Sequence, residues 1–310
     1  MQLQQLRYFT AVAETRNFTR AAERELVAQP SLSQQIRSLE RELGAELFHR
    51  SRTGAVLTDA GEALLPLARR ILADTESARR AVQETVQLRR GRVRFGAPPS
   101  LCVSLVPDVL RAFRAAHPGV DLQLREDGSR GLERALEAGE LDLALVVPPE
   151  GGGPAQLAVT ELLHEELVLV SAGPGAGTPV GRRARIEDLR DRPLVMFREG
   201  YDVRETTLAA CRRAGFEPVY AVEGGEMDAV LASVRAGLGP AVLPGMVAAR
   251  SGLHVTPFAR PALGRTIAVA HGREVPLSRA AAEFRSALLT HLAEAARTGA
   301  LPPGSRLLPH

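Results

Sequence analysis

Apolar residues recur at helical spacing from the start of the chain. Leu3, Leu6, Phe9 and Ala13 lie three or four residues apart and predict one face of an amphipathic helix. Asn17 predicts the N-cap of a short second helix, because an asparagine side chain accepts hydrogen bonds from the first free amides. The opening pattern therefore indicates short helices rather than strands.

A third helix is predicted next, and its two faces differ in chemistry. Pro30 suits the first turn, where its missing N–H costs nothing, and Gly44 suits the residue after the last turn. One face is apolar and consists of Leu32, Ile36, Leu39 and Leu43. The opposite face is polar and consists of Ser33, Gln34, Arg37 and Arg41. A helix, a tight turn and such a second helix predict a helix-turn-helix over about residues 18–37.

A hairpin and a long helix are predicted to follow. Residues 49–58 favour a hairpin with Gly54 at its turn and Arg50 and Arg52 beside it, which suits the wing of a winged helix-turn-helix. Thr58 predicts the cap of a helix that extends to about residue 90. Its stripe has heptad spacing and consists of Leu64, Ala68, Ile71, Thr75, Ala78 and Val82. So narrow a stripe favours pairing with a second copy of the chain.

From residue 91 onward, short apolar runs alternate with helical patterns. Strands and helices alternate over residues 93–147, as in an open, mostly parallel sheet. A second set starts at Leu167, with strands near 194–197, 219–223 and 241–243, and a strand at 266–270 and a helix at 276–296 close the domain. We therefore expect an α/β fold with two lobes and a cleft between them, and a flexible tail over residues 298–310.

Composition and charge narrow the class of protein. The chain has 310 residues, 45% apolar and 24% charged, which fits a globular protein of about two domains. Two cysteines, the lack of a signal-peptide pattern and the lack of a membrane-length apolar run predict a cytoplasmic protein without a membrane partner. All 39 basic residues are arginine, and residues 1–91 hold 14 of them against 11 acidic residues. This excess equals the net charge of +3 of the whole chain and favours a nucleic-acid partner for the first third.

Several motifs together closely resemble the LysR-type transcriptional regulators. They are NFTRAAE (17–23), VAQPSLSQQI (27–36), LERELG (39–44), LTDAG (57–61), PGV (118–120), GELDLA (139–144) and GLG (237–239). The resemblance covers nearly the whole chain. It implies a winged helix-turn-helix in residues 1–58, a dimerising linker helix in 59–90 and an effector domain in 91–297 that resembles periplasmic binding proteins. Lobe I would comprise about 91–162 and 268–297, and lobe II about 163–267.

Candidate DNA contacts follow from the polar face of the third helix and from the wing. Serine, glutamine and arginine side chains bond base edges and phosphates, and a wing arginine can enter the minor groove. The candidates are Gln29, Pro30, Ser31, Ser33, Gln34, Arg37, Arg50, Arg52 and Thr53. The resemblance implies DNA contact for Gln29, Pro30, Ser33 and Gln34. The family often has arginine at the position of Gln34. The alternative is an ordinary solvated face.

Candidate effector contacts lie where strands end and helices begin, the usual place for ligands in α/β sheets. They are Ser100, Leu101, Gly128, Ser129, Val147, Phe197, Tyr201, Asp202 and Arg204. The alternatives are a plain helix cap for Ser100 and a surface charge for Arg204. No cofactor is expected. The histidines lack metal-ligand spacing, no nucleophile with a base stands out, and Gly173–Gly177 lacks the spacing of a phosphate loop, so an enzyme is not expected.

Cys211 supports a second hypothesis about the signal. The family includes peroxide-sensing OxyR-type regulators, and the resemblance aligns Cys211 with their second cysteine but places Asp202 at the peroxide-reactive one. Cys211 then is either a small buried apolar residue or a thiol sensor whose pKa is lowered by Arg212 and Arg213.

The sequence thus predicts a DNA-binding transcription regulator whose effector-induced closure changes the angle between dimers. The expected partners are double-stranded DNA, a small-molecule effector, further copies in a homodimer or homotetramer, and RNA polymerase. From another class, a two-lobed domain also suits a solute-binding protein, but the helix-turn-helix argues against that reading.

Overall fold

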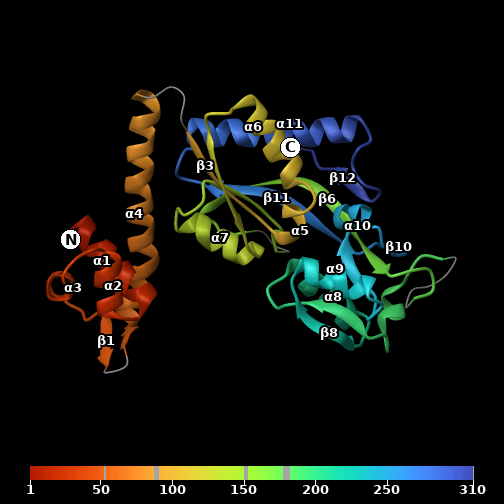
Figure 1. The fold of residues 1–310 in the computed structure, drawn as a ribbon, viewed down its shortest axis with the longest axis horizontal. Coiled ribbons are helices and arrows are strands. Elements are labelled where there is room, and N and C mark those ends of the chain that lie inside the picture. Colours follow the sequence, from red (N-terminus) through yellow and green to blue (C-terminus); the bar gives the residue numbers. More distant parts are fainter. Residues whose placement is uncertain (52–53, 87–90, 150–152, 177–181, 310) are drawn as a thin grey trace. The chain divides into compact units, whose positions relative to one another are not determined.

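The computed structural model describes residues 1–51, 54–86, 91–149, 153–176 and 182–309. The chain divides into two compact units (Figure 1). Unit 1 comprises residues 1–88 with 137–140, and unit 2 comprises 89–136 and 141–310. Within the described residues, no helix has both the length and the apolar character that a membrane crossing requires.

Unit 1 is a helical domain with a two-stranded wing. Its elements are α1 (Leu3–Thr15), α2 (Phe18–Arg24), α3 (Gln29–Leu43), β1 (Phe48–Ser51), β2 (Gly54–Leu57) and α4 (Asp59–Val86). The predicted caps are confirmed: Asn17 Oδ1 accepts from the amides of Thr19 and Arg20, and Gly44 ends α3 with a φ of 70°. Thr58 Oγ1 accepts from the amide of Gly61 at the start of α4. Leu43, which was expected on the apolar face of α3, is instead exposed.

The first half of the heptad stripe of α4 packs against other helices of its own chain. Ala68 is fully buried, and Leu64 and Ile71 pack against the core of unit 1. The first half of the stripe therefore packs partly on α1 within the same chain, and pairing of α4 with a second copy stays a prediction. Ala78 is exposed, and the side chain of Val82 lies outside the described residues. The periodicity identified the buried face correctly but could not tell which surface covers it.

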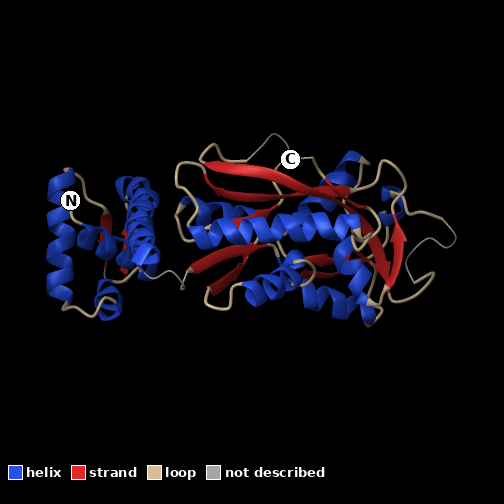
Figure 2. Ribbon diagram, turned by 90° about the horizontal axis from the view of Figure 1, so that it is seen from above, coloured by secondary structure: helices blue, strands red, loops and turns tan. Residues whose placement is uncertain are grey.

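Lobe I of unit 2 consists of a mixed sheet with helices on both faces. Its elements are β3 (Arg92–Ala97), α5 (Pro99–Cys102), α6 (Val106–Ala116), β4 (Asp121–Glu126), α7 (Ser129–Glu137), β5 (Leu143–Val146), β11 (Gly264–Gly272), α11 (Arg279–Arg297) and β12 (Ser305–Leu307). β3 pairs in parallel with β4 and β5, and β5 pairs antiparallel with β11. One apolar core lies under α6 and α11 and another under α7, on the opposite face (Figures 1 and 2).

Lobe II is a smaller α/β layer with its own apolar core. Its elements are η1 (Ile186–Leu189), β7 (Leu194–Phe197), α8 (Asp202–Arg213), β8 (Tyr220–Gly225), α9 (Met227–Arg235), β9 (Ala241–Pro244), α10 (Gly245–Ser251) and β10 (His254–Pro257). β7 and β8 are parallel. The core gathers residues of β7, α8, α9 and β9.

A single strand, β6 (Leu157–Ser171), belongs to both lobes. It pairs with β11 up to Glu166, opposite Gly264, and with β9 and β10 from Leu167 and Val168 onward. The crossing between the lobes therefore lies near residues 166 and 264, and we call this the hinge.

Part of the expected flexible tail instead forms a strand, so that prediction is wrong for residues 305–307. Residues 305–307 form β12, which pairs antiparallel with β6 at residues 163–165. The amide of Glu166 donates to Gly304 O, and the amide of Leu308 donates to Leu162 O. Backbone pairing of this kind does not depend on side-chain type, and the Pro- and Gly-rich composition hid it.

Candidate functional site

One side of α3 is open to solvent over its whole length. Exposed side chains there include most of the predicted DNA contacts: Gln29, Pro30, Ser31, Gln34 and Arg37. None of these side chains is fixed by an ion pair among the described residues. Arg52 and Thr53 lie outside the described residues, and only the backbone of Arg50, in β1, is described.

Ser33 differs from its predicted role. Its side chain is buried, and Ser33 Oγ accepts a hydrogen bond of 3.0 Å from Gln29 Nε2. Ser33 therefore orients the glutamine at the start of α3 and does not itself face solvent in this arrangement. The apolar neighbours on either side of the polar stripe explain the difference, because position 33 lies at the border of the buried face.

The first turn of α3 lacks a side-chain cap. Ala28 occupies the N-cap position with extended backbone, and no side chain accepts from the amides that follow. Asn17 does so for α2. The positive end of the α3 dipole thus meets solvent next to Gln29.

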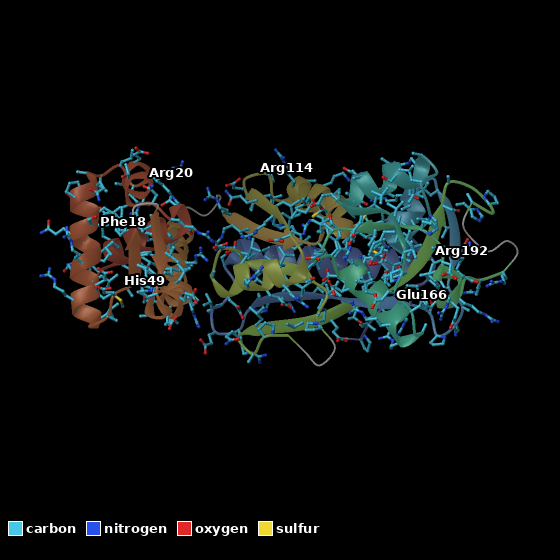
Figure 3. The ribbon with its side chains drawn as sticks, turned by 90° about the horizontal axis from the view of Figure 1, so that it is seen from below. Phe18, Arg20, His49, Arg114, Glu166 and Arg192 are labelled. Carbon is cyan, nitrogen blue, oxygen red and sulfur yellow. The ribbon has the colours of Figure 1, made fainter. Side chains whose placement is uncertain are left out.

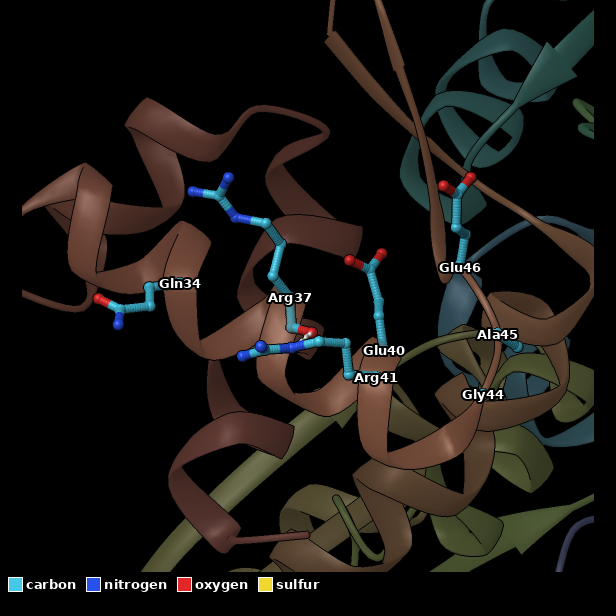
Figure 4. A pocket seen from close by; sticks show the side chains of 7 residues that line it. All are labelled: Gln34, Arg37, Glu40, Arg41, Gly44, Ala45 and Glu46. Carbon is cyan, nitrogen blue, oxygen red and sulfur yellow. Dashed lines mark hydrogen bonds between the residues drawn. The ribbon is translucent and has the colours of Figure 1, made fainter.

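At the other end of α3 the polar side is hollow (Figure 4). A shallow hollow of about 580 Å³ is lined by Gln34, Arg37, Glu40, Arg41, Gly44, Ala45 and Glu46. Glu40 Oε1 accepts from the amide of Leu47 at 3.1 Å, which fixes the chain that leaves the helix. Two guanidinium groups and a glutamine amide remain on this side as hydrogen-bond donors.

The two lobes of unit 2 meet through Ser129 and Asp202. Ser129 Oγ donates to Asp202 Oδ2 at 2.9 Å and accepts from the amide of Val147 at 2.9 Å. Burial raises the pKa of the Asp202 carboxyl, while the nearby charge of Arg265 and the Ser129 hydrogen bond act in the opposite direction. These three predicted residues therefore come together, at a contact that joins α7 of lobe I to α8 of lobe II.

A close backbone approach lies beside this contact. A Cβ atom at Gly128 would stand 2.5 Å from Gly200 O, which is too close for any side chain. Glycine at position 128 is thus required for the lobes to meet as they do. The sequence placed Gly128 at the rim but gave no partner for it.

Ser100 lies at a buried ionic group that sequence analysis missed. Ser100 Oγ accepts from Arg265 Nη2 at 2.9 Å, and the same nitrogen donates to Glu165 Oε2 at 2.9 Å. Glu165 Oε1 also accepts from the amide of Met246 at 2.8 Å. The available signal was a charged residue inside each of two apolar strands, β6 and β11, since such residues are rarely buried without a partner.

The remaining predicted effector residues divide between the lobe cores and a cluster on lobe II. Leu101 and Phe197 are buried in the cores of lobes I and II. Tyr201 stacks on Phe197 with ring centroids 4.9 Å apart, and its hydroxyl donates to Glu226. Burial and this bond to a carboxylate raise the pKa of the Tyr201 hydroxyl.

Arg204 is a buried residue rather than a surface charge. Arg204 Nη1 donates to Phe197 O at 2.7 Å, and Nη2 donates to Glu223 Oε1 at 2.6 Å. Its guanidinium also lies 5.5 Å from the ring centre of Tyr220. The guanidinium therefore holds α8, β7 and β8 together and does not join the contact between Ser129 and Asp202.

Both cysteines have properties opposite to those of a reactive thiol. Cys211 is fully buried, and burial raises its pKa to about 11, so the expected lowering by Arg212 and Arg213 is wrong. Burial and Glu126 raise the pKa of Cys102 to about 12. Thiolate is the reactive form, so both groups are weak nucleophiles at neutral pH. Within the described residues no group of histidine, cysteine and acidic side chains is placed to hold a metal ion.

Comparisons with known proteins agree on one family over most of the chain. Residues 3–62 match the model for the bacterial regulatory helix-turn-helix protein, lysR family, and residues 87–293 match the LysR substrate binding domain. The transcriptional dual regulator GltC of Bacillus subtilis is 31% identical over 291 residues, 92% of this chain and 95% of GltC.

Two solved structures extend the comparison to the fold. A full-length OxyR from Pseudomonas aeruginosa with one cysteine changed to aspartate has a TM-score of 0.69 and 29% identity, covering 93% of this chain and 94% of that one. Full-length CbnR in complex with its target DNA has a TM-score of 0.55 and 25% identity, covering 94% and 100%.

Proposed function

The chain belongs to the LysR family of transcription regulators, and from that premise we propose which residues carry the function. The family combines a DNA-binding helix-turn-helix with an effector-binding domain. In this proposal α3 reads operator DNA, and the Ser129–Asp202 contact between the lobes responds to the effector. Membership of this family also argues against the alternative function as a solute-binding protein.

The open side of α3 is the observation that carries the DNA proposal. Gln34 and Arg37 are exposed there, and these side chains recognise adenine and guanine edges in the major groove. The uncapped amides after Ala28 suit a phosphate oxygen, which would supply the missing acceptor. The wing residues Arg50, Arg52 and Thr53 would contact the backbone or minor groove.

Assembly and location complete the proposal. CbnR has been solved on its target DNA. We propose a homodimer that reads two half-sites and pairs into a homotetramer, acting in the cytoplasm and touching RNA polymerase at the promoter.

The effector would act on the contact between the lobes. A polar ligand that enters beside Ser129 and Asp202 competes for their mutual hydrogen bond, because the hydroxyl has one proton to donate. Such a ligand shifts the population between two arrangements of the lobes, and this shift would change the angle between DNA-binding dimers.

Binding measurements on α3 variants test the DNA proposal. Operators are first mapped by immunoprecipitation of bound genomic DNA, and affinity is then measured by fluorescence anisotropy. Gln34→Ala and Arg37→Ala should each weaken specific binding by about 1–3 kcal/mol, the value of a base-edge contact. Arg111→Ala, an exposed arginine of unit 2, is the matched control and should bind as the unmodified chain does. Unchanged affinity in both α3 variants would remove this helix as the reader.

A further inference from the structure

The chain does not end with α11 but returns to the sheet. After α11, residues 301–308 run beside lobe I, and β12 pairs with β6 at residues 163–165. Leu301 and Leu307 pack against the core of lobe I. The match to the LysR substrate binding domain ends at residue 293, so this segment lies beyond the part shared with the family model.

The segment meets β6 where that strand passes between the lobes. Ser305 stands opposite Glu165 in the ladder, and Gly304 O accepts from the amide of Glu166 at 3.0 Å. From Leu167 onward the same strand pairs with lobe II. The backbone bond between Glu166 and Gly304 therefore lies directly at the hinge.

The segment also approaches lobe II itself. A Cβ atom at Gly245, the first residue of α10, would stand 3.1 Å from Glu166 O and 3.6 Å from Pro303 O. α10 packs on both cores, with Met246 in that of lobe I and Val247 in that of lobe II. The C-terminal segment thus lies against β6 and against the helix that joins the two cores.

Glu165 connects the hinge to Ser100, one of the predicted effector residues. Its buried carboxylate accepts from the amide of Met246 and from Arg265, and Arg265 donates in turn to Ser100. A displacement of β6 at position 165 would therefore move groups in both lobes. The backbone of that position is held on one side by β11 and on the other by β12.

We propose that residues 301–308 form a brace on the hinge, which limits how freely the two lobes move apart. A strand paired on both edges bends less than a strand with one free edge, because bending breaks two ladders instead of one. Without the brace, β6 would lose its pairing at residues 162–166 on one side. The lobes would then sample open arrangements that the brace excludes.

Distances between spin labels on the two lobes test this proposal. Labels are placed at Arg114→Cys on α6 of lobe I, an exposed position (Figure 3), and at Glu187→Cys on η1 of lobe II. The native thiols of Cys102 and Cys211 react slowly because their pKa values are about 12 and about 11. Excess unlabelled chain suppresses distances between copies.

The decisive comparison is between two truncations of the full chain. Removal of residues 301–310 should broaden the distance distribution and add a longer population in pulsed electron paramagnetic resonance. Removal of Pro309 and His310 alone, which spares the Leu308 bond, should leave the distribution unchanged. A truncated chain that melts earlier but keeps the distances of the full chain would show a purely stabilising strand and would overturn the brace.

A second variant covers the case in which the truncated chain does not fold. Leu301→Ala with Leu307→Ala keeps the full length but weakens the packing of the segment on lobe I. It should show the same broadening, and unchanged distances in a folded variant would overturn the proposal.

Discussion

Arg265 and Glu165 form an ion pair almost wholly withdrawn from water, with side chains 2% and 0% exposed and a nitrogen–oxygen distance of 2.9 Å. The residues are 100 positions apart in the chain and lie on the paired strands β11 and β6. Solvent cannot stabilise either charge at this buried position, so each side chain depends on the other to compensate its charge.

Removal of one partner should therefore cost far more stability than removal of both. Glu165→Leu leaves a buried guanidinium uncompensated, and the free energy of unfolding in urea should fall by about 3–5 kcal/mol. The double variant Glu165→Leu with Arg265→Met should recover most of that loss. A single variant within about 1 kcal/mol of the unmodified chain would contradict a buried charge pair, since that is the range of surface pairs.

Leu26 adopts a backbone conformation that disfavours its own side chain. Its φ is 57°, in the left-handed region, and it is 91% exposed in the turn before α3. Leu26→Asn should raise the stability of unit 1 by about 0.5–1 kcal/mol, because asparagine tolerates this region. Leu43→Asn, in a right-handed helix, is the control and should not stabilise. Equal melting temperatures for Leu26→Asn and the unmodified chain would argue against strain in this turn.

Asp202 should make stability depend on pH in an identifiable direction. Burial raises its pKa in the folded chain above the ordinary 3.8, so ionisation costs stability once the pH exceeds that ordinary value. This loss of stability is complete above the raised pKa. It vanishes in acid, where the Asp202 carboxyl is protonated in both the folded and the unfolded chain. Asp202→Asn should thus melt at a higher temperature than the unmodified chain at pH 8, and the difference should shrink as the pH falls. A difference that is constant with pH would contradict the raised pKa.

Cys211 should remain inert towards oxidants. Its full burial and raised pKa leave little thiolate, the form that peroxide attacks. We expect mass spectrometry to find Cys211 unmodified after brief exposure to dilute peroxide, and a reporter in Cys211→Ala cells to respond normally. Rapid sulfenic acid formation at Cys211, together with a silent reporter in that variant, would instead favour the redox alternative.

Two positions on α4 should separate folding from assembly. Ile71 packs on the core of unit 1, so Ile71→Asp should lower its melting temperature by burying a charge. Leu67 is 57% exposed on the same helix, so Leu67→Asp should leave the melting temperature nearly unchanged. If α4 pairs copies through its exposed side, sedimentation should show weaker self-association for Leu67→Asp. A large loss of stability in that variant would place Leu67 in the core instead.

Local chemistry explains which features the sequence predicted correctly. Asn17 and Gly44 act through bonds to residues within a few positions, so their roles follow from residue type and spacing. The alternation of strands and helices similarly gave the α/β fold.

Long-range contacts explain the rest. The Arg265–Glu165 pair and the β12–β6 ladder join segments more than 90 residues apart, and nothing in either segment alone names its partner. Ser33 and Ile71 show a related limit. A stripe on a helix indicates that a face is covered, but the covering surface is a property of the whole fold.

Lobe I is assembled from both ends of unit 2, and this fixes the order in which a newly made chain can mature. Phe95 lies early in the chain, and its ring packs on that of Phe284 at 4.8 Å, so the lobe cannot close on the ribosome until nearly all residues have emerged. Nearly all of unit 1 lies within residues 1–88. A chain whose translation stops early would thus leave the ribosome with its operator-binding part formed and its sensor missing. Control by the effector is the last property that this protein acquires during its synthesis.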